Sequence, residues 1–149
     1  MRTAIIILIS LLNIVPLIAQ NQPSDKVQAA RVKFFNEKLE LTPDESKKFW
    51  PIYNDYQSRK NKLTTERKNL MSFFSSNQSN MSEKEIAETL DRYVAIEKEE
   101  TQLLETYNQK FRQVLPDEKV LKIYLTEIQF RNYLLKQLRT QQQEIKPRN

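Results

Sequence analysis

The chain has 149 residues, with 24 Lys and Arg against 19 Asp and Glu, and it contains no glycine, cysteine or histidine. Without cysteine it cannot form disulfides, and without histidine and cysteine it lacks the usual transition-metal ligands, so we expect no metal site and no cofactor. Nucleophilic catalysis would lack a base of suitable pKa, and no phosphate-binding loop is present. The composition therefore predicts a single domain that is not an enzyme and has no catalytic residues.

Residues 1–19 have the pattern of a secretory signal peptide. Arg2 precedes an apolar run that ends at Ala19, where we expect cleavage, and the run is interrupted and too short for a membrane-spanning helix. We therefore expect a periplasmic protein whose mature domain covers residues 20–149. Basic residues alternate with acidic ones in this exported chain, so we do not expect it to bind nucleic acid.

The charge balance changes along the chain. Residues 81–107 carry 3 basic and 8 acidic side chains, whereas residues 108–149 carry 9 basic and 4 acidic ones. An acidic middle is therefore followed by a basic C-terminal part.

The first predicted helix begins at Ser24 or Asp25 and ends near Glu40. One face is apolar, with members spaced as on a helix. These members are Val27, Ala30, Phe34 and Leu39. Because the chain has no glycine, any left-handed helix cap must use another residue.

The second helix has a complete start signal. Thr42 is a suitable N-cap, Pro43 suits the first helical position, and Glu45 can return a hydrogen bond to the cap as in a capping box. We expect this helix to run to about Phe74. Its apolar stripe consists of Phe49, Ile52, Tyr53, Tyr56, Leu63, Leu70, Met71 and Phe74.

Pro51 lies almost opposite this stripe and follows Trp50. A proline on the outer face would bend the helix toward its partners and produce a curved, cradle-like surface. Alternatively, Pro51 separates a short first turn from the main helix. Both interpretations fit the sequence.

A polar loop over residues 75–80 precedes a third helix, which Ser82 and Glu85 open with a second capping box. This helix runs to about Gln113. Ile86, Leu90, Tyr93, Leu104, Tyr107, Phe111 and Val114 lie on one of its faces.

Two carboxylates, Glu97 and Glu100, occupy the centre of that apolar face. If the second and third helices form an antiparallel hairpin that turns at the middle of the loop, Lys60 faces Glu97. We interpret Lys60 and Glu97 as a structural ion pair that sets the register of the hairpin, since a carboxylate metal site in a helical bundle normally includes histidine.

The fourth helix starts at Pro116 and reaches about Gln142. It carries two apolar seams, one with Leu121, Tyr124, Ile128 and Leu135, and a second with Ile123, Phe130 and Leu134. The second seam, together with Phe34 or Phe35 of the first helix, could form a dimer contact or a surface for a bound protein. Alternatively, the helix is buried between two neighbours of its own chain.

The segment from Leu41 to Glu45 resembles the first LTxxQ motif of the Spy/CpxP family, with Glu in place of the final Gln. A second stretch, at Leu115 and Pro116, matches the position of the second motif, although it departs from the pattern at Thr and Gln. The resemblance covers the mature chain and includes Trp50 and Pro51. It is greatest to a branch found in Bacteroidetes, some of whose members are described as sensors of ECF-type sigma factors.

This resemblance implies an all-α, antiparallel, cradle-shaped homodimer that functions in the envelope stress response. The implied activity is that of an ATP-independent chaperone-like protein binding unfolded or partly folded periplasmic proteins. The alternative is a regulator that docks on the periplasmic domain of a membrane sensor kinase or anti-sigma factor.

Overall fold

The computed structural model describes residues 25–145, in which four α-helices and no strand are present. The helices are α1 (Asp25–Leu39), α2 (Pro43–Asn77), α3 (Glu83–Arg112) and α4 (Asp117–Ile145), with a short 3₁₀ turn, η1 (Gln78–Asn80), between α2 and α3. The all-α prediction is confirmed. The expected signal peptide lies outside the described residues, and within them no helix is long and apolar enough to cross a bilayer.

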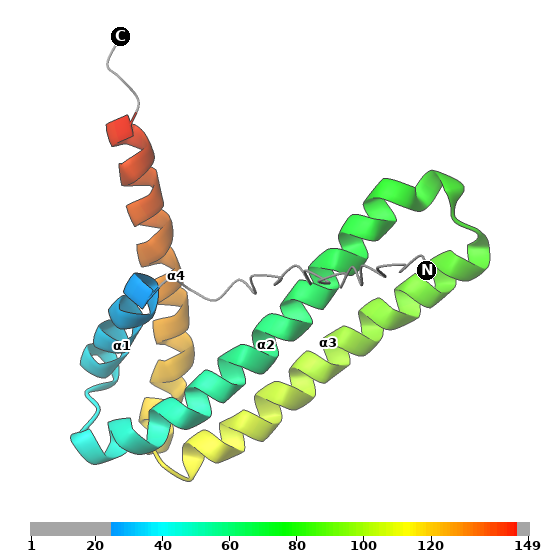
Figure 1. Cartoon of the computed structure of the whole chain (residues 1–149). Coiled ribbons are helices and arrows are strands. Elements are labelled where there is room, and N and C mark those ends of the chain that lie inside the picture. Colours follow the sequence, from blue (N-terminus) through cyan, green and yellow to red (C-terminus); the bar gives the residue numbers. More distant parts are fainter. Residues whose placement is uncertain (1–24, 146–149) are drawn as a thin grey trace, which may run out of the picture.

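The helices α2 and α3 lie side by side as a long antiparallel hairpin, and α1 and α4 pack together at one end of it (Figure 1). Both predicted capping boxes are present: Thr42 and Glu45 cap each other's backbone at the start of α2, as Ser82 and Glu85 do at the start of α3. α2 runs unbroken through Pro51, which is exposed. The capping residues in the sequence therefore determine where both long helices begin.

The end of α1 shows how the chain manages without glycine. Glu40 follows the helix with φ of 50°, the left-handed conformation that glycine normally occupies. The amide of Leu41 donates to the carbonyl of Asn36 at 3.2 Å, which closes the last turn. A non-glycine residue therefore redirects the chain from α1 into α2.

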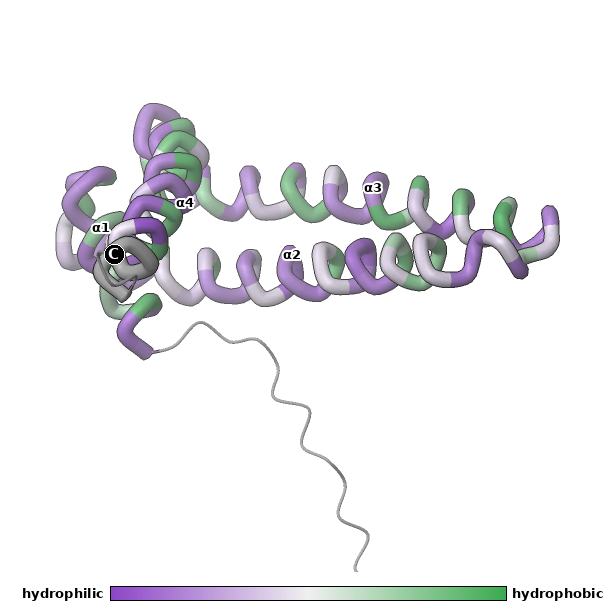
Figure 2. Tube along the Cα trace, turned by 90° about the horizontal axis from the view of Figure 1, so that it is seen from above, coloured by the Kyte–Doolittle hydropathy of each residue, from purple (hydrophilic) through white to green (hydrophobic). Residues whose placement is uncertain are grey.

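The core is a cluster of aromatic rings where the four helices meet. Phe35, Phe49 and Phe111 are fully buried, and Tyr53 lies with its ring centroid 4.9 Å from that of Phe35. Seen from above, α1 and α4 gather at this end, while the far half of the hairpin stands clear of them (Figure 2). Packing is therefore concentrated at one end of an elongated molecule.

The seam of α4 that we expected at a dimer or client surface lies in this core instead. Ile123 is 0 % exposed and Phe130 is 3 % exposed, and Leu134 packs against the same cluster. The ring of Phe130 lies 5.5 Å from that of Phe34 and 6.2 Å from that of Phe35. The surface prediction is wrong for these residues because α1 packs antiparallel along this side of α4 and covers it.

We predict that Phe130→Ala lowers the free energy of unfolding by about 3–5 kcal/mol, because it leaves a cavity among packed aromatic rings. The measurement is urea denaturation followed by circular dichroism. Leu121→Ala is the matched control on the same helix, since Leu121 is 71 % exposed, and it should change stability by less than about 0.5 kcal/mol. Equal losses in the two variants would contradict this packing.

Candidate functional site

The structure joins the two segments that carry the family resemblance. The ammonium group of Lys119, in the first turn of α4, donates to Glu45 at 2.7 Å and to the carbonyl oxygen of Glu40 at 2.8 Å. Glu45 also accepts from the backbone amide of Thr42 at 2.8 Å. The hydrogen bond from Lys119, supported by that from Thr42, lowers the pKa of Glu45 below its usual value. The start of α2 is thereby tied to the start of α4.

Trp50 of α2 contributes a hydrogen bond that connects α2 to α1. Its indole Nε1 donates to the side-chain oxygen of Asn36 at 3.1 Å, and Ser46 donates to the same oxygen at 3.2 Å. Near the start of α4, Leu115 is buried, whereas Pro116 is exposed. Thr42, Glu45 and Trp50 therefore make contacts that hold the helices together.

Lys60 pairs with a different partner from the one we predicted. Its ammonium group lies 3.1 Å from a carboxylate oxygen of Glu127 on α4. Burial of Lys60 lowers its pKa, but the charge and hydrogen bond of Glu127, together with Tyr56, outweigh this, and the net shift is upward. Gln57 donates to the same carboxylate. The contact therefore fastens α4 to α2.

Glu97 pairs with Arg67, as does Glu100, at 2.8 and 2.7 Å. The prediction of a Lys60–Glu97 pair is wrong because α2 continues to Asn77 and the turn falls on residues 78–82, later than the centre of the loop that we assumed. α3 is therefore shifted along α2 relative to the predicted alignment. As a result Arg67, two turns beyond Lys60, pairs with both Glu97 and Glu100.

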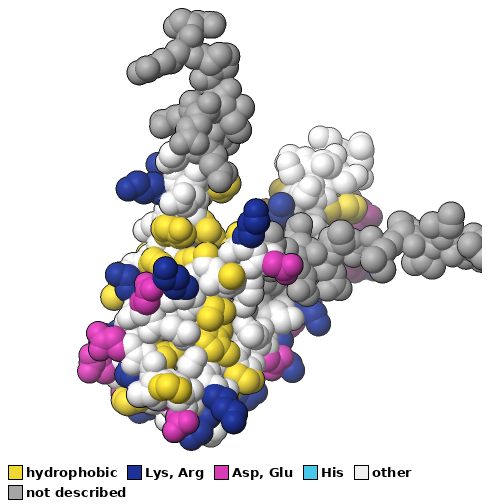
Figure 3. All heavy atoms as spheres, turned by 60° about the vertical axis from the view of Figure 1, so that its left-hand side comes forward, with side chains coloured by type: hydrophobic (Ala, Val, Ile, Leu, Met, Phe, Trp, Pro, Cys, Tyr) yellow, Lys and Arg dark blue, Asp and Glu magenta, His cyan; other side chains and the backbone are white. Residues whose placement is uncertain are grey.

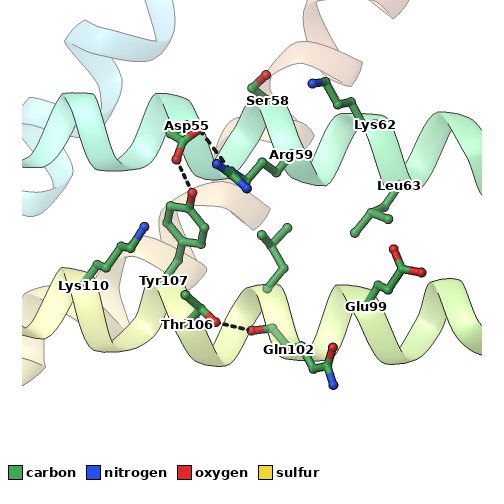
Figure 4. Close-up of a pocket in the computed structure, with 11 residues that line it drawn as sticks. Asp55, Ser58, Arg59, Lys62, Leu63, Glu99, Gln102, Thr106, Tyr107 and Lys110 are labelled. Carbon is green, nitrogen blue, oxygen red and sulfur yellow. Dashed lines mark hydrogen bonds and ion pairs between the residues drawn. The ribbon is translucent and has the colours of Figure 1, made fainter.

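An open groove of about 600 Å³ runs between α2 and α3 (Figure 4). Apart from Leu63 and Tyr107, the sequence analysis did not single out the side chains that line it. Tyr107 donates its hydroxyl to Asp55, which also accepts from Arg59 at 3.2 Å. The hydrogen bond from Tyr107 lowers the pKa of Asp55, and burial raises the pKa of Tyr107. Lys110 lies 4.2 Å from the centroid of the Tyr107 ring. These groups satisfy one another across the hairpin.

A larger exposed feature is a row of aliphatic side chains along α4, which we call the α4 stripe. It consists of Leu121, Leu125, Ile128 and Leu135, which are 71 %, 54 %, 56 % and 47 % exposed. Successive members are four, three and seven residues apart, which places them on one face of the helix. Space-filling atoms show hydrophobic side chains among charged ones over the end of the molecule where α1 and α4 lie (Figure 3). Three of these residues, Leu121, Ile128 and Leu135, belong to the first of the two seams that the sequence predicts on this helix.

A second row, the α3 stripe, lies on α3 and consists of Ile86, Leu90, Val94 and Leu104. Leu90 and Val94 are the most exposed members, at 60 % and 58 %. Near the base of the hairpin, Tyr124 of α4 donates to Asn108 of α3 at 3.0 Å. Because Asn108 is one turn beyond Leu104, the α3 stripe starts beside the base of α4 and runs outward along the hairpin.

Comparison of the chain with protein-family models, with curated proteins and with solved structures finds no match.

We predict that the Glu45 contact makes stability depend on pH. A carboxyl whose pKa is lowered by folding stabilises the folded state above its unfolded pKa, near 4.3, and loses this effect as the pH falls through its folded pKa. At pH 7 we expect Glu45→Gln to be less stable by about 0.5–1 kcal/mol, because the amide keeps the cap but not the pair with Lys119. Thermal melts should show this difference shrinking below about pH 4. A difference independent of pH would contradict the assignment.

We also predict that Lys60 couples energetically to Glu127. In a double-mutant cycle, Lys60→Met and Glu127→Leu should show an interaction energy of at least about 0.5 kcal/mol, because each single change leaves a half-buried charge unpaired. The control cycle combines Lys60→Met with Glu97→Leu, and it should be additive. Chemical denaturation gives the free energy of unfolding of each variant. Coupling in the control cycle alone would mean that Lys60 faces Glu97, as the sequence analysis predicted, and would contradict the pair with Glu127.

Proposed function

We propose that the protein is a periplasmic, ATP-independent chaperone-like protein that binds partly folded proteins on the α4 stripe. The observation that carries this proposal is the row of four aliphatic side chains, each about half exposed or more, on a helix anchored by its opposite face. Contiguous exposed apolar surface rimmed by charge is typical of sites that bind other proteins.

Basic side chains flank the α4 stripe. Lys122 and Lys136 lie along one edge and Arg131 along the other, since successive residues turn by about 100° around a helix. The long stems of these residues extend the apolar surface, while their charged ends attract acidic segments. Such a surface favours loose, reversible binding of chains that expose both apolar and acidic residues.

The resemblance of residues 41–45 and 115–119 to the Spy/CpxP motifs supports the same function. The predicted signal peptide supports a periplasmic location and a role in envelope stress. A regulator that docks on a membrane signalling protein would use the same kind of surface, but for one partner.

We predict that the protein slows the aggregation of a chemically denatured model enzyme when present in several-fold molar excess, as followed by light scattering. Leu125→Gln combined with Ile128→Gln should remove most of this effect, because it makes the centre of the α4 stripe polar. The stability of this variant should change little, since both residues are more than half exposed.

The matched control removes two exposed apolar side chains elsewhere. Met71 and Phe73, near the tip of the hairpin, are 44 % and 55 % exposed, and changing both to Gln should leave aggregation suppression unchanged. An unmutated protein that fails with every unfolded client would refute the proposal. If capture from membranes then returned a single signalling protein, the regulator would be the better assignment.

A further inference from the structure

The groove between α2 and α3 carries three basic side chains. Arg59 and Lys62 line its α2 wall, and Lys110 lines its α3 wall (Figure 4). Among the described side chains, neither Lys62 nor Lys110 forms an ion pair with a carboxylate. The ammonium group of Lys110 lies over the ring of Tyr107, 4.2 Å from its centroid, but a neutral ring does not compensate its charge. The two lysines therefore keep their charges available to a ligand.

Arg59 can also bind a further group. Its Nε donates to Asp55 at 3.2 Å, whereas its two terminal amino groups donate to no acceptor among the described side chains. The side chain of Arg59 is 59 % exposed. Because a guanidinium has five N–H donors, Arg59 can hold a carboxylate of another molecule while it keeps its contact with Asp55.

The two carboxylates of the groove are already paired. Asp55 accepts from the hydroxyl of Tyr107 as well as from Arg59. Glu99 accepts from Arg92 at 2.8 Å. Each carboxylate thus has a compensating cation, and the charges of the two lysines remain. The groove therefore attracts negatively charged ligands.

Apolar side chains lie between the two basic walls. Leu63 of α2 and Leu103 of α3 are half-buried and line the groove, and Leu63 points toward α3 (Figure 4). α4 contacts the hairpin at Lys60 and Asn108, which lie on the opposite side of α2 and α3 from the groove. The groove is therefore open to other molecules and offers them apolar as well as positively charged surface.

The three cations are spread along the hairpin. The contact between Tyr107 and Asp55 places these two residues at the same level. Lys110 lies three residues from Tyr107, toward the base of the hairpin. Lys62 lies seven residues from Asp55, toward the tip. At 1.5 Å per residue, the lysines are about 15 Å apart with Arg59 between them, and about five residues of extended chain cover this distance.

This distribution selects the shape and the chemistry of the ligand. A single small anion would need cations that converge on one point, whereas these are arranged in a row. Polyphosphate or a nucleic acid could bind the row of cations but would gain nothing from Leu63 and Leu103. An extended peptide in which acidic residues alternate with apolar ones satisfies both parts of the groove. Its apolar side chains point into the groove, and the long basic side chains reach its carboxylates from the walls.

We propose that this groove binds an extended acidic segment of another protein chain, with apolar side chains of the segment on the two leucines and its carboxylates paired with the three cations. The site is distinct from the α4 stripe, and the inference does not rest on the proposed function. It assigns to the hairpin a binding role of its own, selective for acidic sequences.

Fluorescence anisotropy with a labelled peptide tests the site. The probe has about eight residues in which Asp alternates with Val, enough to span the groove. Lys62→Gln combined with Lys110→Gln should raise its dissociation constant at least about tenfold, because both uncompensated charges are removed. The matched control, Lys47→Gln with Lys48→Gln, makes the same change in net charge at exposed positions of α2 outside the groove, and it should raise the constant less than about threefold. An unmutated protein that does not bind the probe, or equal losses in the two variants, would overturn the proposal.

Two further peptides test the chemistry of the ligand. Replacing Val by Ser throughout the probe should weaken binding at least about fivefold, because the contact with the leucines is lost. Replacing Asp by Lys should abolish binding. Equal binding of the Ser peptide, or equally tight binding of inorganic polyphosphate, would identify a general polyanion surface and overturn the assignment to acidic peptides.

The α4 stripe supplies the last control. Leu125→Gln with Ile128→Gln should bind the probe as the unmutated protein does, because both changes lie on another helix. Loss of peptide binding in this variant would place the peptide on the α4 stripe and overturn the groove assignment. A protein that binds the peptide in the groove but suppresses no aggregation would refute only the proposed function.

Discussion

The aromatic cluster at the base of the hairpin is the contact on which the rest of the molecule depends. Phe35 of α1, Phe49 and Tyr53 of α2, and Phe111 of α3 meet there, and Phe130 brings α4 into the same cluster. Aromatic side chains bury large areas for each residue, which suits a chain that has no cysteine and therefore no disulfide. The capping interactions of Thr42, Glu45 and Lys119 lie beside this cluster and fix the direction in which each helix leaves it.

Because burial is concentrated at the base, the outer parts of the helices keep exposed apolar residues. Beyond Tyr56, no residue of α2 is fully buried, and α3 has only Ile96 buried before Tyr107. The outer hairpin is held instead by ion pairs between α2 and α3, such as Arg67 with Glu97 and Glu100, and Arg92 with Glu66. Exposed pairs of this kind contribute little net stability but keep two long helices in register. The stripes of α3 and α4 are therefore available to another molecule.

The sequence predicted the helices much better than it predicted their partners. Capping residues act locally, so Thr42 with Glu45 and Ser82 with Glu85 could be identified from spacing alone, and both starts are confirmed. The Lys60 partner depended on where the loop turns, and three further helical residues in α2 were enough to move the pairing. The two seams of α4 are equally apolar, and only the position of α1 decides which of them is buried. Tertiary placement of this kind leaves no local signal.

The two long helices that carry exposed apolar residues differ in charge. α3 (Glu83–Arg112) carries 8 acidic and 5 basic side chains, whereas α4 (Asp117–Ile145) carries 4 acidic and 5 basic ones. Lys122, Arg131 and Lys136 flank the α4 stripe, so two α4 stripes that faced each other would bring like charges together along their edges. Repulsion of this kind disfavours self-association through the stripe, and selectivity depends on such repulsion as much as on attraction.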